Sequence, residues 1–246
     1  AQAVALEMGA NKVKTHSFSF TKRDEELTTE PMIVDAEPIF NTTGGYGNAI
    51  LPGVLILILQ QTLLLGIGLS AGTARENNRF QDLVPIGKHY DGILKIVFGK
   101  SFCYFMVYCV MAAYVTMAVP HFFSFTMLAR PTDLFRLLIP YLLAVIFFGM
   151  TLSCLVRYRE NVMLLVVFTS IPFLFLTGAS WPQSSIPGIW QGFSWIIPST
   201  FGVRGYLRIA SMGGTINDIL PEVRALWIQA TIYFFTTCFV YRYQII

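Results

Sequence analysis

Long apolar stretches, separated by short charged connections, constrain this chain more than any other feature of its sequence. A helix needs about 20 mostly apolar residues to cross the hydrocarbon core of a bilayer. Charged residues make up 13% of the chain, against about 25% in a typical soluble domain. The sequence therefore predicts an all-α polytopic membrane protein with five transmembrane helices, at roughly 50–72, 101–120, 137–156, 161–179 and 225–241.

One uncharged run is longer than a single span requires. No Asp, Glu, Lys or Arg occurs from Asn161 to Val203, and as one helix this run would be about 65 Å long, about twice the hydrocarbon thickness. Proline is favoured in the first turn of a helix and disfavoured inside it. We therefore expect a short helix starting near Pro187 and a second starting at Pro198, with the segment 180–203 folded as an outer re-entrant helical hairpin.

The tryptophans of this segment support its placement near the membrane surface, because the indole ring favours the interface where its N–H finds a partner. The residues that we assign to the hairpin are Trp181, Pro182, Pro187, Trp190, Gln191 and Pro198. An amphipathic loop on the membrane surface is the alternative interpretation of the same residues.

The sequence carries no pattern typical of an enzyme or a metal site. Its four cysteines lack CxxC spacing, its three histidines are scattered, and it has no P-loop, HExxH or GxSxG motif. We therefore expect no catalytic residue, metal or cofactor on this chain, and any ATP and Mg²⁺ to be used by another chain. The net charge of +3 gives no indication of nucleic-acid binding.

Basic residues in the short connections predict the orientation, because they concentrate on the cytoplasmic side. The connections after the first and third predicted spans, with the C-terminal end, contain Arg75, Arg79, Lys88, Lys95, Lys100, Arg157, Arg159 and Arg242. This side and the C-terminus are predicted to be cytoplasmic, which places residues 1–48 outside. An outside segment without a signal-peptide pattern requires an earlier span, so we expect that a sixth, first span is missing from the sequence.

Two stretches resemble a known family, the permease subunits of type-2 ABC exporters (ABC-2 type). "LTGASWPQSSIPGIWQGFSWIIPSTFGVRGYLRI" is similar to the closing signature of these permeases, with its matches at Gly178, Pro182, Pro187, Trp190-Gln191, Pro198-Ser199-Thr200 and Arg204-Gly205. "ARENNRFQDLVPIGKHYDGILKIVFGKSFCY" resembles their cytoplasmic segment, and Pro52-Gly53 match the mouth of the preceding span. The resemblance covers residues 38–246.

The resemblance implies a six-span permease that moves a substrate out across a bacterial inner membrane. Two permease copies, or a permease and a paralogue, would stand side by side above two cytoplasmic ABC ATPase subunits, with membrane lipid around them and a periplasmic adaptor as a further partner. Residues 1–48 would be the end of an extracytoplasmic domain and its linker, and residues 49–246 the transmembrane domain.

The resemblance also assigns a coupling role to the cytoplasmic segment 74–95. Transmission of movement from an ATPase needs a rigid amphipathic helix that docks in a groove. Phe80 and Leu83, three residues apart, would form an apolar edge on such a helix. The charged residues that flank this edge are Arg75, Glu76, Arg79 and Asp82. The alternative is a solvated basic loop that only fixes the topology.

Two polar residues, Gln60 and Gln61, lie near the middle of the first predicted span. Polar side chains in a membrane must find partners, so they either join helices or line the substrate pathway or the dimer seam. Two further functions remain open for the whole chain: an ATP-independent channel or secondary transporter, and a non-transporting membrane scaffold. The former would be expected to carry buried ionisable residues at mid-membrane.

Overall fold

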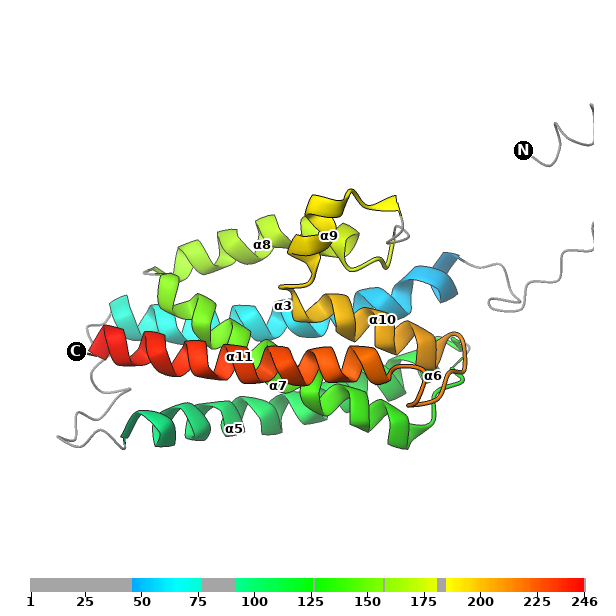
Figure 1. Ribbon diagram of the computed structural model, residues 1–246, viewed down its shortest axis with the longest axis horizontal. Coiled ribbons are helices and arrows are strands. Elements are labelled where there is room, and N and C mark those ends of the chain that lie inside the picture. The colour runs from blue at the N-terminus through cyan, green and yellow to red at the C-terminus, as the bar shows by residue number, and fades with distance from the viewer. Residues whose placement is uncertain (1–45, 77–91, 126, 157, 181–184, 246) are drawn as a thin grey trace, which may run out of the picture. The chain divides into compact units, whose positions relative to one another are not determined.

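Five long helices run back and forth along a common direction in the computed structural model, which describes residues 46–76, 92–125, 127–156, 158–180 and 185–245 (Figure 1). Each is long and apolar enough to span a membrane. They are α3 (Tyr46–Glu76), α5 (Gly92–Ala113) with its continuation to Phe122, α7 (Pro131–Leu155), α8 (Arg159–Leu176) and α11 (Leu220–Ile245). The prediction of an all-α polytopic membrane protein is confirmed.

The bundle has two ends, which we call the Tyr46 end and the Glu76 end after the first and last residues of α3.

The second span starts at Gly92, nine residues before the start that the apolar pattern predicts. The prediction excluded Lys95 and Lys100 because they are charged, but the helix includes both residues. After α5 the same span passes through a π-helical turn, η1 (Tyr114–Ala118), and ends in α6 (Val119–Phe122). The long side chains of Lys and Arg can lie along apolar surface and keep their charged heads in water, so a spanning helix can include them near its ends.

Two short helices connect α8 to α11. The first, α9 (Gly188–Ser194), has Pro187 as its N-cap, and the second, α10 (Pro198–Ala210), has Pro198 in its first turn. Both helices begin where the prolines predict. The predicted residues Trp181 and Pro182 lie outside the described residues, as do Arg79, Phe80, Asp82 and Leu83 of the cytoplasmic segment.

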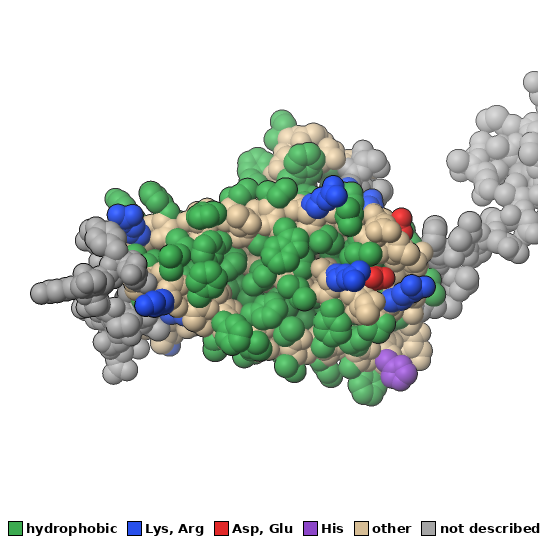
Figure 2. All heavy atoms as spheres, turned by 60° about the horizontal axis from the view of Figure 1, so that its bottom comes forward, with side chains coloured by type: hydrophobic (Ala, Val, Ile, Leu, Met, Phe, Trp, Pro, Cys, Tyr) green, Lys and Arg blue, Asp and Glu red, His purple; other side chains and the backbone are tan. Residues whose placement is uncertain are grey.

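Helix α7 forms the centre of the bundle. It packs against α3, α5, α10 and α11, and most of its side chains are buried, whereas the spans α5 and α8 are largely exposed. Exposed large apolar side chains are therefore numerous on the outer helices, as at Phe102, Val110 and Phe168. On the face seen in Figure 2 they cover the middle of the bundle, with Lys and Arg towards both ends. This distribution matches the hydrocarbon core and its two interfaces.

Close contact between α7 and α10 depends on two glycines of α10. A Cβ added at Gly202 would lie 2.5 Å from the ring of Tyr141, and one added at Gly205 would lie 2.8 Å from Leu137. Small residues let membrane helices approach closely, which increases their van der Waals contact. Tyr141 also links α7 to α3, because its hydroxyl donates a 2.7 Å hydrogen bond to the Ile56 carbonyl.

Replacement of Gly202 by alanine should destabilise the protein, because the added methyl must displace the buried Tyr141 ring. Overpacking of this kind costs about 1–3 kcal/mol, which a thermal unfolding curve of the purified full-length protein would detect. Gly192→Ala on α9 is the matched control, since no atom lies within 4 Å of a Cβ added there. Equal unfolding midpoints for the two variants would contradict the packing described.

Candidate functional site

The described residues of the predicted sites fall in two regions of the bundle. Arg75 and Glu76 lie at the Glu76 end, in the last turn of α3. The hairpin residues lie beside the other half of the bundle. Pro198 is buried, Gln191 is half-buried and Trp190 is exposed. The two regions are connected through α3.

Arg75 binds the end of α7. Its Nη1 donates to the Val156 carbonyl and its Nη2 to the Cys154 carbonyl, each at 2.8 Å. The last carbonyls of a helix have no partner within it and carry partial negative charge. The guanidinium therefore caps α7 with two charge-assisted hydrogen bonds, which are stronger than neutral ones.

Glu76, the next residue, binds the start of α8. Its Oε1 accepts a 2.9 Å hydrogen bond from the backbone N–H of Arg159. Its Oε2 lies 3.4 Å from Nε of the same arginine, whose side chain is mostly exposed. A carboxylate at a helix N-terminus is favoured by the unpaired N–H groups there. The pair Arg75-Glu76 thus attaches the turn between α7 and α8 to the end of α3, a role that the sequence did not predict.

Gln60 binds the N-terminus of α10 in the middle of the bundle. Its Oε1 accepts a 2.8 Å hydrogen bond from the buried backbone N–H of Ser199. Gln60 lies about 15 Å along α3 from Ile50, the first residue of the span, at about 1.5 Å per residue. The turn before α10 therefore reaches about two-fifths of the way along this 27-residue span.

Two side chains of α11 bind the same turn from the other side. Gln229 Nε2 donates a 2.6 Å hydrogen bond to the Trp195 carbonyl, and the Tyr233 hydroxyl donates to the Ile196 carbonyl. Our sequence analysis missed both residues. Gln229 is a polar residue inside an apolar span, as Gln60 is, and that signal could have found it.

Several buried polar atoms have no hydrogen-bond partner among the described residues. Those of residues that bind this turn or follow it are Gln60 Nε2, Gln229 Oε1, Ser199 Oγ and Thr200 Oγ1, and both amide atoms of Gln61 on α3 are unpartnered as well. Gln60 and Gln61 are both buried within the chain, and the Gln60 bond to Ser199 joins two helices. Lining of a pathway or dimer seam by these glutamines stays a prediction.

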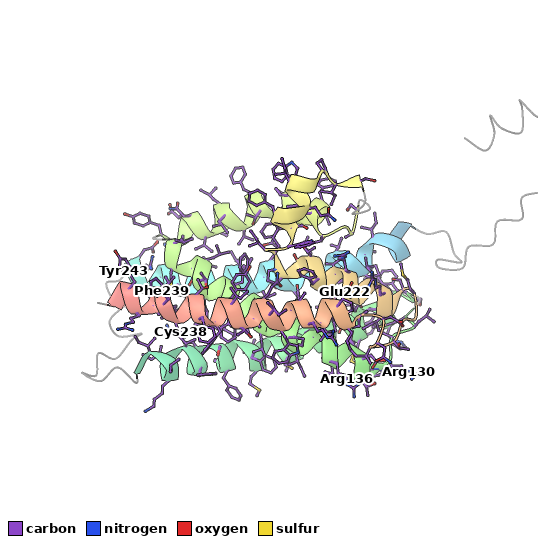
Figure 3. All side chains as sticks on the ribbon, viewed as in Figure 1. Arg130, Arg136, Glu222, Cys238, Phe239 and Tyr243 are labelled. Atoms are coloured by element: carbon purple, nitrogen blue, oxygen red, sulfur yellow. The ribbon has the colours of Figure 1, made fainter. Side chains whose placement is uncertain are left out.

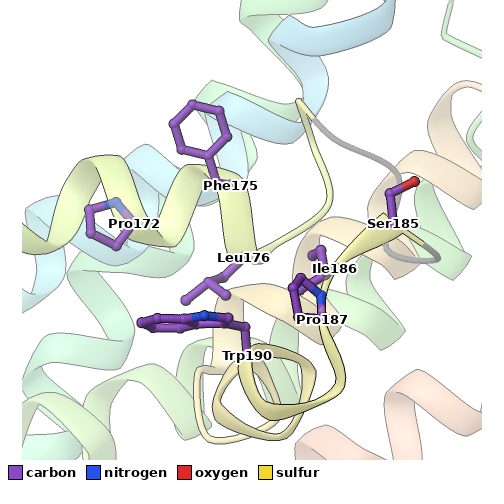
Figure 4. A pocket seen from close by; sticks show the side chains of 7 residues that line it. All are labelled: Pro172, Phe175, Leu176, Ser185, Ile186, Pro187 and Trp190. Atoms are coloured by element: carbon purple, nitrogen blue, oxygen red, sulfur yellow. The ribbon is translucent and has the colours of Figure 1, made fainter.

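A hollow of about 390 Å³ lies between α8 and the hairpin (Figure 4). Apart from Ser185, its lining is apolar and consists of Pro172, Phe175, Leu176, Ile186, Pro187 and Trp190. The volume is at the lower end of the range for small-molecule pockets, about 300–1,000 Å³. The hollow can therefore take an apolar group, and none of the described residues that line it is charged.

A charge pair joins α10 to α11 at the Tyr46 end. Arg208 Nη1 lies 2.7 Å from Glu222 Oε1, and the Glu222 side chain is buried. Glu222 is labelled on α11 in Figure 3, with Arg130 and Arg136 at the end where α7 begins. A buried carboxylate is costly unless it is paired, so this contact holds the end of α10 against the start of the last span.

The turn between α10 and α11 is closed by a second carboxylate, Asp218. It accepts hydrogen bonds from the backbone N–H and the hydroxyl of Thr215, at 2.8 and 2.9 Å. These bonds lower the pKa of Asp218. They therefore stabilise the turn above the ordinary pKa of aspartate, and this contribution is lost as the pH falls through the lowered value.

Taken together, these features define the class of protein: a polytopic all-helical membrane protein with a hydrogen-bonded helical hairpin inserted among its spans. A family model described as "ABC-2 family transporter protein" matches residues 4–239. The chain therefore belongs to the ABC-2 transporter family, which makes it a membrane permease of a transporter. No match was found among curated proteins or among solved structures.

Replacement of Arg75 by alanine should lower the free energy of unfolding by about 1–3 kcal/mol, because two carbonyls at the end of α7 lose a charged donor. Arg159→Ala is the control. It removes only an exposed ion pair worth about 0–1 kcal/mol and keeps the backbone N–H that Glu76 binds. Chemical denaturation of both variants measures the difference. An Arg75→Ala variant no less stable than Arg159→Ala would contradict the capping role.

Proposed function

We propose that this chain is the membrane-spanning permease subunit of an ATP-driven exporter, which moves a substrate out across a bacterial inner membrane. A separate cytoplasmic ABC ATPase subunit binds ATP together with Mg²⁺ and hydrolyses the ATP. The observation that carries this proposal is the family match over residues 4–239, together with five helices able to span a membrane. Permeases of this family generally work with an ABC ATPase.

The proposed orientation places the Glu76 end in the cytoplasm, with the C-terminus there and the N-terminal segment outside. The support is the positive-inside preference. Basic residues of the short inner connections, such as Arg75 and Arg159, lie at that end. The hairpin then enters the membrane from the outer side.

Coupling to the ATPase would use the segment that follows α3. Phe80 and Leu83 are proposed to dock on the ATPase, with Arg79 and Asp82 beside them. Arg75 and Glu76 are proposed to pass this movement on to the spans, because they bind the end of α7 and the start of α8. A displacement of the segment would then move three helix ends together.

A second permease copy or paralogue is proposed to complete the pathway. The support is the exposed face of α8 and α9, which includes Phe168, Trp190 and Phe193. Irregular backbone at membrane depth is tolerated where protein covers it, and α9 contacts mainly α8. A periplasmic adaptor is a further proposed partner, at the outer end.

The alternatives are less well supported. A proton- or ion-driven transporter would be expected to place ionisable residues in the middle of the membrane. Asp133 and Glu222, the buried carboxylates of the described residues, lie in the first turns of α7 and α11 instead. A non-transporting scaffold is disfavoured by the family match, whose description is that of a transporter.

Purification of the tagged full-length protein in mild detergent tests the proposal. We expect a stoichiometric ABC ATPase in the eluate, identified by mass spectrometry and by Mg²⁺-dependent ATP hydrolysis. The variant Phe80→Ser with Leu83→Ser should lose this subunit, because the apolar edge proposed for docking is removed. Glu160→Ala changes an exposed residue at the same end and should retain it.

Two outcomes would count against this account in different ways. An eluate without any ATPase for the unaltered protein would remove the proposed function. Normal recruitment by the Phe80 and Leu83 variant would remove only the docking assignment.

A further inference from the structure

Unpartnered polar atoms from three helices belong to side chains that bind the turn before α10 or lie in the first turn of α10. Gln60 on α3 and Gln229 on α11 each use one amide atom to bind the turn 195–199. The hydroxyls of Ser199 and Thr200, in the first turn of α10, bind nothing among the described residues. All four side chains are at least nine-tenths buried.

Each glutamine amide already uses one atom in a hydrogen bond, which determines whether its remaining atom is a donor or an acceptor. Because Gln60 Oε1 accepts from the Ser199 N–H, its free atom is Nε2, which can only donate. Because Gln229 Nε2 donates to the Trp195 carbonyl, its free atom is Oε1, which can only accept. The two hydroxyls can do either. The free atoms beside this turn therefore include one that only donates, one that only accepts and two that can do either.

Unpaired polar atoms in an apolar interior are costly, and native structures pair most of them with protein or with ordered water. An anion would satisfy the donors and leave Gln229 Oε1 unpaired, and a metal cation would leave Gln60 Nε2 unpaired. Water accepts and donates at once, and buried waters typically form about three hydrogen bonds with such groups.

We propose that the tip of the re-entrant hairpin is a hydrated site, in which one or more bound waters join Gln60 of α3, Ser199 and Thr200 of α10, and Gln229 of α11. This inference is independent of the transported substrate and of the ATPase. The waters complete the hydrogen bonds of a turn that lies about two-fifths of the way along the first span, where lipid offers none.

The sign of a stability change tests the proposal. Ser199→Ala and Thr200→Val remove the hydroxyls and change the side-chain volume little. A hydroxyl that is hydrogen-bonded to a bound water stabilises the folded protein. Each variant should therefore lower the unfolding midpoint of the full-length protein in lipid nanodiscs by about 2–4 °C. A hydroxyl that truly binds nothing would give the opposite result, because its replacement relieves an unpaired polar group.

Thr231→Val is the matched control, since its hydroxyl bonds the Trp227 carbonyl of its own helix and faces outward. Its midpoint should change less than that of Thr200→Val. A rise of the midpoint in both site variants would overturn the proposal.

A direct measurement distinguishes water from an anion. A high-resolution cryo-EM map of the full-length protein should show a solvent peak within hydrogen-bonding distance of Gln60 Nε2, and Thr200→Val should remove it. The midpoint of the unaltered protein should not depend on whether chloride or gluconate is the salt anion. A chloride-dependent rise that Ser199→Ala abolishes would show an anion site and contradict the hydrated one, as would a map without a peak.

Discussion

The structure depends on one constraint, the need of every backbone polar group within a membrane to find a partner in protein or in bound water. Five continuous helices meet it internally, but the turn between α9 and α10 does not. Gln60, Gln229 and Tyr233 supply the missing partners for Ser199, Trp195 and Ile196. These three side chains therefore stabilise the hairpin tip beside the middle of α3.

The same reasoning explains the Glu76 end. The end of α7 and the start of α8 expose unpaired carbonyl and N–H groups, and the adjacent residues Arg75 and Glu76 bind them. Helix α3 thus holds the α7–α8 turn at one end and the hairpin tip near its middle. In the proposed exporter, α3 thus connects the cytoplasmic Glu76 end, where the ATPase would bind, to the hairpin on the outer side, where the substrate would leave.

Much of the fold follows from the sequence, because its signals are local. Apolar length predicts the five spans, and Pro187 and Pro198 predict where α9 and α10 begin. The partners of the hairpin do not follow in the same way. Gln60 and Ser199, or Gln229 and Trp195, are far apart in the chain, so no periodicity relates them. The sequence predicts only a coupling role for Arg75 and Glu76, because it does not show that α7 ends and α8 begins beside them.

The contacts of the hairpin tip with α3 and α11 predict that it lies within the hydrocarbon core. A nitroxide label at Ile196, an exposed residue of the turn, tests it in the full-length protein with its four native cysteines replaced. Val110 on α5 and Phe122 at the end of α6, both exposed, serve as the lipid and interface references. We predict that the label at 196 is accessible to oxygen and shielded from a water-soluble nickel complex, as at 110. Accessibility to nickel equal to that at 122 would place the segment on the membrane surface and contradict the account.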